Sequence, residues 1–343
     1  MSIPGDVESA VAGARAILEP NVSPGSTLAI IGSTDIDHSY YQCFVAAAVR
    51  LDVEPVVGLM LPREAPGLPA PTQIAACARE ADTVLLTGSA SLAHSSTALD
   101  ALEAGRKVIT FPVPMGHGAA MTYLAGQRSY DLERLEQLRD SCIAVATVLD
   151  AGETVHATSP TGTDLTVSMA GRTSHSWYGI ADEYGHRITA WPPGECHVAA
   201  LEASANGVVV VDGYISGLGV SHPPLELRFS YGALVGVTGG ASDKLHELLA
   251  RFGESAGVLC EIGIGVNPWQ QISGTNADKN ALGTWHLAIG TNASACFGGT
   301  DFDGLNASSI HLDFVSAVQS SLSVDGDQLL TDGHLRLAGH GRS

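Results

Sequence analysis

The periodicity of apolar residues changes once along this chain, and that change constrains the fold more than any other feature of the sequence. Up to about residue 145, helical patterns alternate with short continuous apolar runs, at 27–32, 54–61, 83–87 and 107–111. Such runs between turn residues are typical of buried parallel strands, and their alternation with helices favours a sheet covered on both faces. Residues 1–145 are therefore predicted to form an α/β domain.

From about residue 146 onward the segments become short, alternating or β-branched, which is typical of antiparallel strands. The predicted strands are 154–158, 164–169, 198–200, 207–213, 225–231, 258–266 and 286–290, with a helix at 242–252 and a last strand pair near 329 and at 334–337. The segment 225–237 reads as a hairpin with its turn at Tyr231-Gly232. The sequence therefore predicts two domains, an α/β domain in 1–145 and a β-rich α+β domain in 146–343, in line with ~100–200 residues per domain.

The charge balance limits the partners that the chain can bind. The sequence has 36 acidic and 17 basic side chains and a formal net charge of −19. Nucleic acids and anionic membrane surfaces are bound through basic patches, so neither is expected as a partner. No apolar run approaches the ~20 residues of a membrane span, and the first segment does not resemble a signal peptide. We expect a small-molecule substrate and a cytoplasmic location.

Five residues of the second half combine metal-binding side chains with a position in or beside an apolar strand. Glu261 lies inside the apolar run 257–268, where a carboxylate is unfavourable unless it is paired or binds a cation. His311 and Asp313 are two residues apart, so in a strand they point to the same face and can share one ion. Imidazole and carboxylate without thiolate suit Zn, Mn, Co or Fe. The predicted metal ligands are Glu195, Glu261, His286, His311 and Asp313.

Aromatic residues and a histidine next to these positions are predicted to bind the substrate. They are His175, Trp177, Trp191 and Trp269. Aromatic walls favour a small hydrophobic or cyclic substrate over a long polar peptide. His197, which is close to Glu195 in the sequence, is interpreted as a neighbour of the site and not as a ligand.

The second half resembles the thermophilic leucyl aminopeptidase family (aminopeptidase T and S type), whose members are metallopeptidases with two metal ions acting together. The resemblance rests on Pro193-Gly-Glu195, the 225–237 hairpin, Glu261-Ile-Gly-Ile-Gly-Val-Asn-Pro268, His286-Leu-Ala-Ile-Gly290 and His311-Leu-Asp313. It implies that the five predicted ligands bind the metals, and that the protein forms a homodimer or a larger homo-oligomer. The first half resembles the family's first domain only in its alternation of helices and strands.

Two positions depart from this family. Lys279, in Asp278-Lys279-Asn280, stands where the family has a further metal-binding glutamate. The segment 291–294 lacks the tyrosine that follows the His-x-x-x-Gly motif in the family. A lysine near the cations is expected to weaken the binding of a second metal by like-charge repulsion. We therefore expect poor activity on ordinary peptides.

A related branch with the same fold is the 2,5-dihydroxypyridine 5,6-dioxygenases, which bind one iron on a smaller ligand set that includes the His-x-Asp pair. Residues 262–268 and 311–313 match this branch as well. The branch has a histidine at the position of Glu261 and lacks counterparts of Glu195 and His286. The number of ligands in this sequence is therefore nearer to that of the hydrolases.

The predicted function is metal-dependent hydrolysis of an amide, lactam or peptide bond in a small, hydrophobic or cyclic substrate. A divalent cation (Zn, Mn or Co) lowers the pKa of its bound water towards ~7 and polarises the carbonyl group. Glu195 or Glu261 is the catalytic base that accepts the proton of this water, and the sequence leaves both open. The alternatives are a ring-cleaving dioxygenase with one non-haem Fe(II) and a non-catalytic metal- or small-molecule-binding protein.

Overall fold

The computed structural model describes residues 4–113, 119–182, 187–293, 304–316 and 319–337, and it divides the chain into two compact units. Unit 1 contains Met1–Gln137 and Trp177–Pro193, and unit 2 contains Leu138–Ser176 and Gly194–Ser343. The sequence predicts a single boundary near residue 145. The structure instead crosses between the units at three places, because a segment of the second half returns to unit 1.

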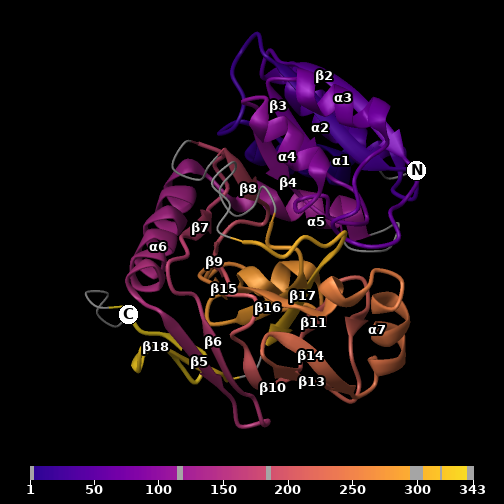
Figure 1. Cartoon of the computed structure of the whole chain (residues 1–343). Coiled ribbons are helices and arrows are strands. Elements are labelled where there is room, and N and C mark those ends of the chain that lie inside the picture. The colour runs from indigo at the N-terminus through magenta and orange to yellow at the C-terminus, as the bar shows by residue number, and fades with distance from the viewer. Residues whose placement is uncertain (1–3, 114–118, 183–186, 294–303, 317–318, 338–343) are drawn as a thin grey trace. The chain divides into compact units, whose positions relative to one another are not determined.

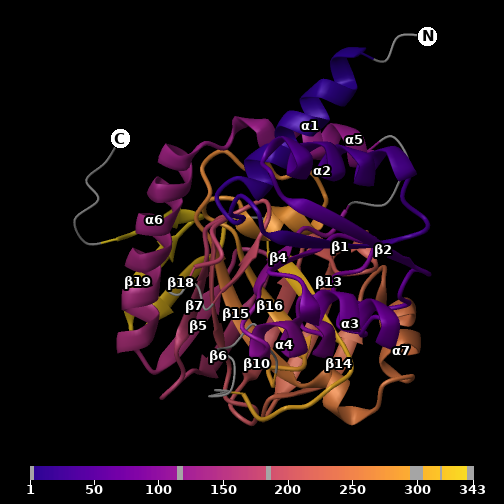
Figure 2. The same cartoon turned by 90° about the horizontal axis from the view of Figure 1, so that it is seen from above.

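Unit 1 is built around a parallel sheet with the strand order β2-β1-β3-β4-β8. Its strands are β1 (Thr27–Ser33), β2 (Glu54–Met60), β3 (Thr83–Leu86), β4 (Lys107–Thr110) and β8 (Ile188–Ala190). Its helices are α1 (Pro4–Leu18), α2 (His38–Arg50), α3 (Thr72–Glu80), α4 (Ser96–Glu103) and α5 (Ala119–Gly126). Figure 2 shows α1, α2 and α5 on one side of the strands and α3 and α4 on the other. The predicted α/β architecture is confirmed.

The fifth strand of this sheet, β8, lies outside the predicted strands. It pairs in parallel with β4, with Val108 opposite Ile188, although a long stretch of unit 2 separates the two strands in the sequence. Three residues are too few to show a period, so the pattern of apolar residues does not reveal such a strand. After β8 the chain enters unit 2 at Gly194.

Unit 2 contains two largely antiparallel sheets (Figure 1). The eight-stranded sheet has the order β14-β13-β10-β6-β5-β18-β19-β20, and the seven-stranded sheet has the order β12-β11-β17-β16-β15-β9-β7. The strands are β5 (Thr154–Thr158), β6 (Asp164–Ser168), β7 (Ser174–Trp177), β9 (Glu195–Ala199), β10 (Asn206–Val211), β11 (Tyr214–Ile215), β12 (Gly219–Val220), β13 (Leu225–Ser230), β14 (Ala233–Thr238), β15 (Leu259–Gly265), β16 (Trp285–Gly290), β17 (His311–Ser316), β18 (Ser321–Val324), β19 (Asp327–Thr331) and β20 (His334–Leu335).

The predicted hairpin is present as β13 and β14, with Ser230 opposite Ala233 and the turn at Tyr231-Gly232. Both turn residues have positive φ, which a tight hairpin turn requires. The helix α7 (Ser242–Leu249) follows, and short 3₁₀ turns occur at Gln127–Ser129, Glu254–Gly257 and Asn276–Asn280 (η3). The last helix before the β-rich part is α6 (Leu132–Ala151), which runs past the predicted boundary near residue 145, so the β-rich part begins at β5.

The seven-stranded sheet forms the core around the site. Every residue of its four central strands, β9, β15, β16 and β17, is buried. These strands nevertheless carry acidic side chains and histidines, and buried charges need partners. Among the helices that the structure describes, none combines the length and the apolar character that a membrane span needs.

Candidate metal centre

The register of the four central strands brings charged side chains to one face of the seven-stranded sheet. Glu261 and Gly263 are two residues apart on β15, so they point to the same face. Gly263 lies opposite His197 of β9 on one side and opposite His286 of β16 on the other. Glu261 and Asp313, the latter on β17, lie opposite the same residue of β16. Residues that are far apart in the sequence therefore share one small area.

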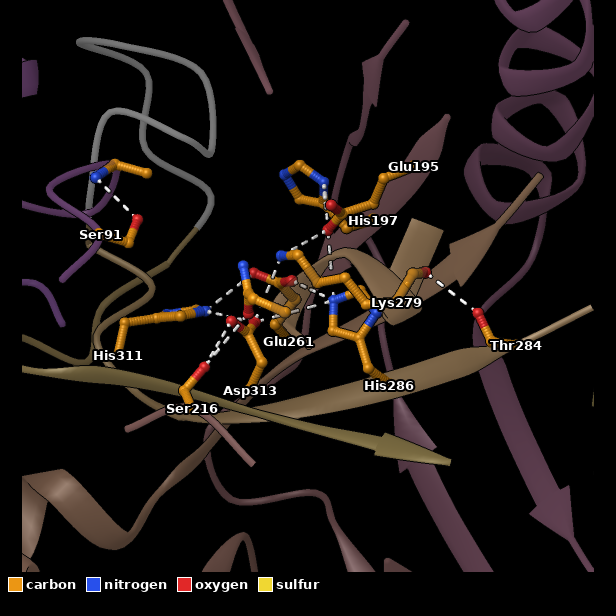
Figure 3. A network of polar contacts seen from close by, with 12 residues as sticks. Ser91, Glu195, His197, Ser216, Glu261, Lys279, Thr284, His286, His311 and Asp313 are labelled. Atoms are coloured by element: carbon orange, nitrogen blue, oxygen red, sulfur yellow. Dashed lines mark hydrogen bonds and ion pairs between the residues drawn. The ribbon is translucent and has the colours of Figure 1, made fainter. Parts of the chain in front are cut away.

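The structure brings all five predicted ligands together in this area (Figure 3). His286 Nε2 lies 2.9 Å from Glu261 Oε1 and 3.2 Å from Glu195 Oε1. His311 Nε2 lies 3.4 Å from Glu261 Oε2 and 3.6 Å from Asp313 Oδ1. None of the five residues is more than 7% exposed. The sequence therefore identified a cluster of ionisable groups that is shielded from water.

Two glycines of β15 provide the space that this cluster fills. A Cβ atom on Gly263 would overlap the imidazole ring of His286. A Cβ atom on Gly265 would overlap the carbonyl oxygen of Ala281 and would lie 2.7 Å from that of Lys279. The alternation in Glu-Ile-Gly-Ile-Gly thus has a physical reason, because the glycines keep the charged face open while the isoleucines pack on the other face.

A lysine, Lys279, also points into the cluster. Its ammonium nitrogen donates hydrogen bonds to Glu195 Oε1 at 3.2 Å and to Asp313 Oδ1 at 3.4 Å, and the side chain is only 7% exposed. Figure 3 shows this side chain reaching between the carboxylates, which come from different strands. The sequence predicts a positive charge near the site, and in the structure this charge forms ion pairs with the carboxylates of Glu195 and Asp313.

The turn η3 fixes the position of this lysine. Thr275 and Asp278 form a capping box at the start of the turn, and the Asp278 carboxylate also accepts a hydrogen bond of 2.7 Å from the backbone N–H of Gly274. The hydroxyl of Thr284 lies 3.1 Å from the carbonyl oxygen of Lys279. Because Asp278 is fully buried within its turn, it serves the local backbone and is not a member of the cluster.

Two histidines extend the cluster along β9 and β7. His197 Nδ1 lies 3.5 Å from Glu195 Oε1, and the rings of His197 and His175 stack with their centroids 5.7 Å apart. Potential ligand atoms of Glu195, His197 and Glu261 lie within 4.8 Å of one another. His197 is therefore a potential ligand as well as a neighbour of Glu195. Its signal was the spacing Glu-x-His in a strand, which places both side chains on one face.

The predicted substrate-binding residues occupy different surroundings. His175 lies beside His197, whereas Trp177 is the buried last residue of β7, where the chain passes to unit 1, and Trp191 is buried in unit 1. Trp191 packs edge-on against Tyr130 and donates its indole N–H to a backbone carbonyl oxygen, as a core residue does. Trp269 is partly exposed in unit 2. A role of the three tryptophans in substrate binding stays a prediction.

Groups outside the cluster orient two of its members. His311 Nδ1 lies 2.9 Å from the carbonyl oxygen of Thr291, an arrangement in which Nδ1 carries the proton and Nε2 faces the cluster. The hydroxyl of Ser216 donates a hydrogen bond of 3.0 Å to Asp313 Oδ2, which leaves Oδ1 directed at the cluster. Burial raises the pKa of the nearby Cys260 thiol to about 11, which favours its neutral form.

Burial and ion pairing act in opposite directions on these groups. Burial favours the neutral carboxyl form, but the ammonium of Lys279 and the neighbouring histidines together outweigh it and hold the pKa of Glu195 and of Asp313 below their ordinary values. Burial likewise opposes the charge of Lys279, and the two carboxylates reverse that effect and raise its pKa. Burial lowers the pKa of His286, but Glu195 and Glu261 together outweigh that effect and raise it to about 9. The cluster is thus strongly ionic.

The cluster fits a divalent cation. Glu195 Oε2 and Glu261 Oε2 are buried carboxylate oxygens without a hydrogen bond, and His286 Nδ1 is a buried ring nitrogen in the same condition. Potential ligand atoms of Glu261, His286 and Asp313 lie within 4.8 Å of one another. Buried carboxylate oxygens without a hydrogen bond are unfavourable unless a cation binds them. A ligand set of carboxylate oxygens and imidazole nitrogens suits Mn, Fe, Co or Zn.

Comparisons with known proteins agree with this geometry. A model of the 2,5-dihydroxypyridine 5,6-dioxygenase family matches residues 13–337. The structure of a 2,5-dihydroxypyridine dioxygenase from Pseudomonas putida KT2440 is similar, with a TM-score of 0.74 and 17% identity over 99% of this chain and 100% of that one. AmpT from Thermus thermophilus is also similar, with a TM-score of 0.71 and 19% identity over 96% and 99% of the two chains.

A comparison with curated proteins finds no match. The two similar structures confirm the predicted fold class and both branches of the predicted resemblance. At these levels of identity they show a shared fold, so the chemistry has to be argued from the site.

Proposed function

Because the chain belongs to the 2,5-dihydroxypyridine 5,6-dioxygenase family, we propose that it uses one metal ion and dioxygen to open a hydroxylated heteroaromatic ring. The observation that carries this proposal is the family match over nearly the whole chain, which includes every residue of the buried cluster. The sequence alone ranked hydrolysis above ring cleavage. The family match reverses that order.

In this proposal the metal ion is Fe(II), and Glu261, His311 and Asp313 hold it. They come from two strands of one sheet, and His311 Nε2 lies within 3.6 Å of a carboxylate oxygen of each of the other two. Rigid strands hold ligands more exactly than loops do. When bound, Fe(II) supplies the position at which dioxygen and a ring hydroxyl group come together.

Glu195 is the group best suited to accept the proton of the substrate hydroxyl. Its Oε1 is held by Lys279 and lies 3.2 Å from His286 Nε2, whereas its Oε2 is buried and accepts no hydrogen bond. A carboxylate oxygen in this state can receive a proton without first losing a partner. Glu195 thus has the role of general base, and Glu261 that of a ligand.

The surroundings of Glu195 favour a flat and compact substrate. The ring of His197, which is next to Glu195, stacks on the ring of His175 with an angle of 27° between them. A flat ring with hydroxyl groups can stack on or hydrogen-bond to imidazole rings, whereas an extended peptide needs a long groove. This supports a dihydroxylated pyridine or a similar ring as the substrate class.

Oxygen uptake tests the proposal. The protein is reconstituted with Fe(II) under anaerobic conditions and mixed with 2,5-dihydroxypyridine and oxygen-containing buffer. We expect uptake of one O₂ for each ring lost, as followed by the ring absorbance. Asp313→Asn is expected to abolish uptake, and Asp327→Asn, at an exposed position of β19, is expected to leave it unchanged. An iron-loaded protein that leaves dihydroxypyridines intact would count against the proposal.

Metal-dependent hydrolysis of an amide, lactam or peptide bond is the second candidate. The observation in its favour is that Glu195 and His286 join Glu261, His311 and Asp313, which makes a larger donor set than one iron needs. A panel of leucyl anilides and small cyclic amides with Mn, Co or Zn tests it. Turnover of these compounds without oxygen uptake would favour this candidate over ring cleavage.

A further inference from the structure

We infer that the ammonium group of Lys279 is a built-in cation of the metal centre, which takes the place of a second metal ion and limits the centre to one. The inference rests on the proposed function, because it concerns the same site. It goes further by assigning the lysine a role in setting the number of metal ions.

The first argument is the position of the ammonium group. Lys279 Nζ lies 3.2 Å from Glu195 Oε1 and 3.4 Å from Asp313 Oδ1. These carboxylates come from β9 and β17, which are separated in the sheet by β15 and β16. A group that contacts both must lie across the middle of the charged face. An ammonium group has three donors and no acceptor, so it occupies this position as a cation and cannot act as a metal ligand.

The second argument is charge balance. The carboxylates of Glu195, Glu261 and Asp313 bring three negative charges to the buried cluster. The ammonium of Lys279 and one divalent ion bring three positive charges, even when every imidazole is neutral. One metal ion therefore already balances the three carboxylates. A second divalent ion would leave two uncompensated positive charges in a buried site, which is strongly unfavourable.

The third argument is that Lys279 cannot easily leave. Its backbone is held in η3 by the capping box and by the hydroxyl of Thr284. The turn also packs directly over Gly265, where no side chain would fit. Movement of the side chain to solvent would leave two buried carboxylates without their cation. The ammonium is therefore a permanent part of the site.

Counting metal ions tests the inference without reference to turnover. Wild type, Lys279→Gln and Lys279→Glu are saturated with Mn(II), freed of excess metal and analysed by elemental analysis and electron paramagnetic resonance. Lys244→Gln and Lys244→Glu, at an exposed position of α7, are the matched controls. We expect one ion per chain in wild type and both controls, with the spectrum of isolated Mn(II). We expect two ions and a spin-coupled pair in Lys279→Glu, whose four carboxylates balance two divalent ions.

The outcomes separate this inference from the proposed function. Two ions in wild type, or one ion in folded Lys279→Glu and Lys279→Gln alike, would overturn the role of the lysine while a metal enzyme remains. No bound ion in wild type would overturn the metal centre and, with it, this inference. If circular dichroism shows that Lys279→Glu is unfolded, Lys279→Gln is decisive, because a neutral side chain also removes the built-in cation. We expect a second ion in that variant as well, bound more weakly than in Lys279→Glu, because three carboxylates leave two divalent ions with one uncompensated positive charge.

Discussion

The parallel sheet of unit 1 and the seven-stranded sheet of unit 2 both have strands with completely buried segments, but they carry different polar groups there. In unit 1 the buried strands β1 and β3 are apolar apart from serine and threonine hydroxyls. In unit 2 the strands β9, β15, β16 and β17 carry carboxylates and imidazoles. The first sheet needs no further component for a stable interior, whereas the second needs a counter-charge.

Hydrogen bonding shows the same contrast. In unit 1 the hydroxyl of Tyr40 lies 2.6 Å from that of Thr87, and the hydroxyl of Tyr41 donates to the carbonyl oxygen of Ser33 at 2.8 Å. In unit 2, Oε2 of Glu261 has no hydrogen bond. Hydroxyl groups can be satisfied by neighbouring protein atoms, but a cluster of carboxylates is satisfied by cations. The comparison therefore indicates that the buried polar groups of unit 2, unlike those of unit 1, favour the binding of a cation over the stability of the metal-free fold.

The largest effect is expected for Glu261→Ala. The substitution removes a ligand from the centre of the cluster, so metal affinity should fall by more than the ~10–100-fold that the loss of an outer partner costs. Turnover should be lost with it. The metal-free variant should fold but be less stable than wild type, because His286 and His311 lose their carboxylate partner in a buried site. Calorimetric titration with metal and circular dichroism check these two expectations. Metal binding equal to that of wild type would contradict the conclusion that the buried charges of unit 2 bind a cation.

Gly263→Ala should have the next largest effect. The added Cβ would overlap the ring of His286, which has no free space to move into. Overpacking of this kind costs about 1–3 kcal/mol of unfolding free energy, and the displaced ring should weaken metal binding as well. The control is Gly126→Ala in unit 1, where a Cβ meets nothing within 4 Å. Equal unfolding midpoints and metal affinities in the two variants would contradict the role of Gly263.

Ser216→Ala should have a moderate effect on metal binding and little effect on the fold. The serine hydroxyl orients Asp313 through a hydrogen bond of 3.0 Å. Loss of such an outer partner costs about 10–100-fold in metal affinity. Metal titration of the variant checks this, and an unchanged affinity would show that the β-sheet alone orients Asp313.

The smallest effect is expected for Tyr40→Phe in unit 1. Thr87 keeps its hydrogen bond of 2.8 Å to the carbonyl oxygen of Phe111, so only one buried hydrogen bond is lost. The cost should be about 1 kcal/mol of unfolding free energy, with no change in metal affinity. Denaturant unfolding measures the first quantity. A change in metal binding would mean that polar groups of unit 1 serve the metal centre, and the contrast between the units would be lost.

Much of the fold and the centre of the site follows from local sequence patterns. The strands of unit 1 are continuous apolar runs, and Glu261 is conspicuous because it interrupts one. His311 and Asp313 could be assigned to one face because the period of a strand is two residues. These predictions needed no information about distant parts of the chain.

The remaining features depend on pairing between distant segments. β8 joins a sheet whose other strands all lie before residue 111, and its three residues carry no period of their own. Lys279 points inward because it meets Glu195, a residue 84 positions away. The count of ligands favoured hydrolysis, because the sequence does not reveal that this lysine contributes a cation. The charge balance of the site depends on residues that only the folded chain brings together.

Thermal unfolding with and without metal tests the central claim most directly, namely that the buried charges of unit 2 exist to bind a metal ion. Wild type and Glu261→Ala are compared after chelation and again after addition of Fe(II) or Mn(II) under anaerobic conditions. Metal at one hundred times its Kd should stabilise wild type by about 2.7 kcal/mol and leave Glu261→Ala unchanged. Equal unfolding midpoints of wild type with and without metal would contradict the claim.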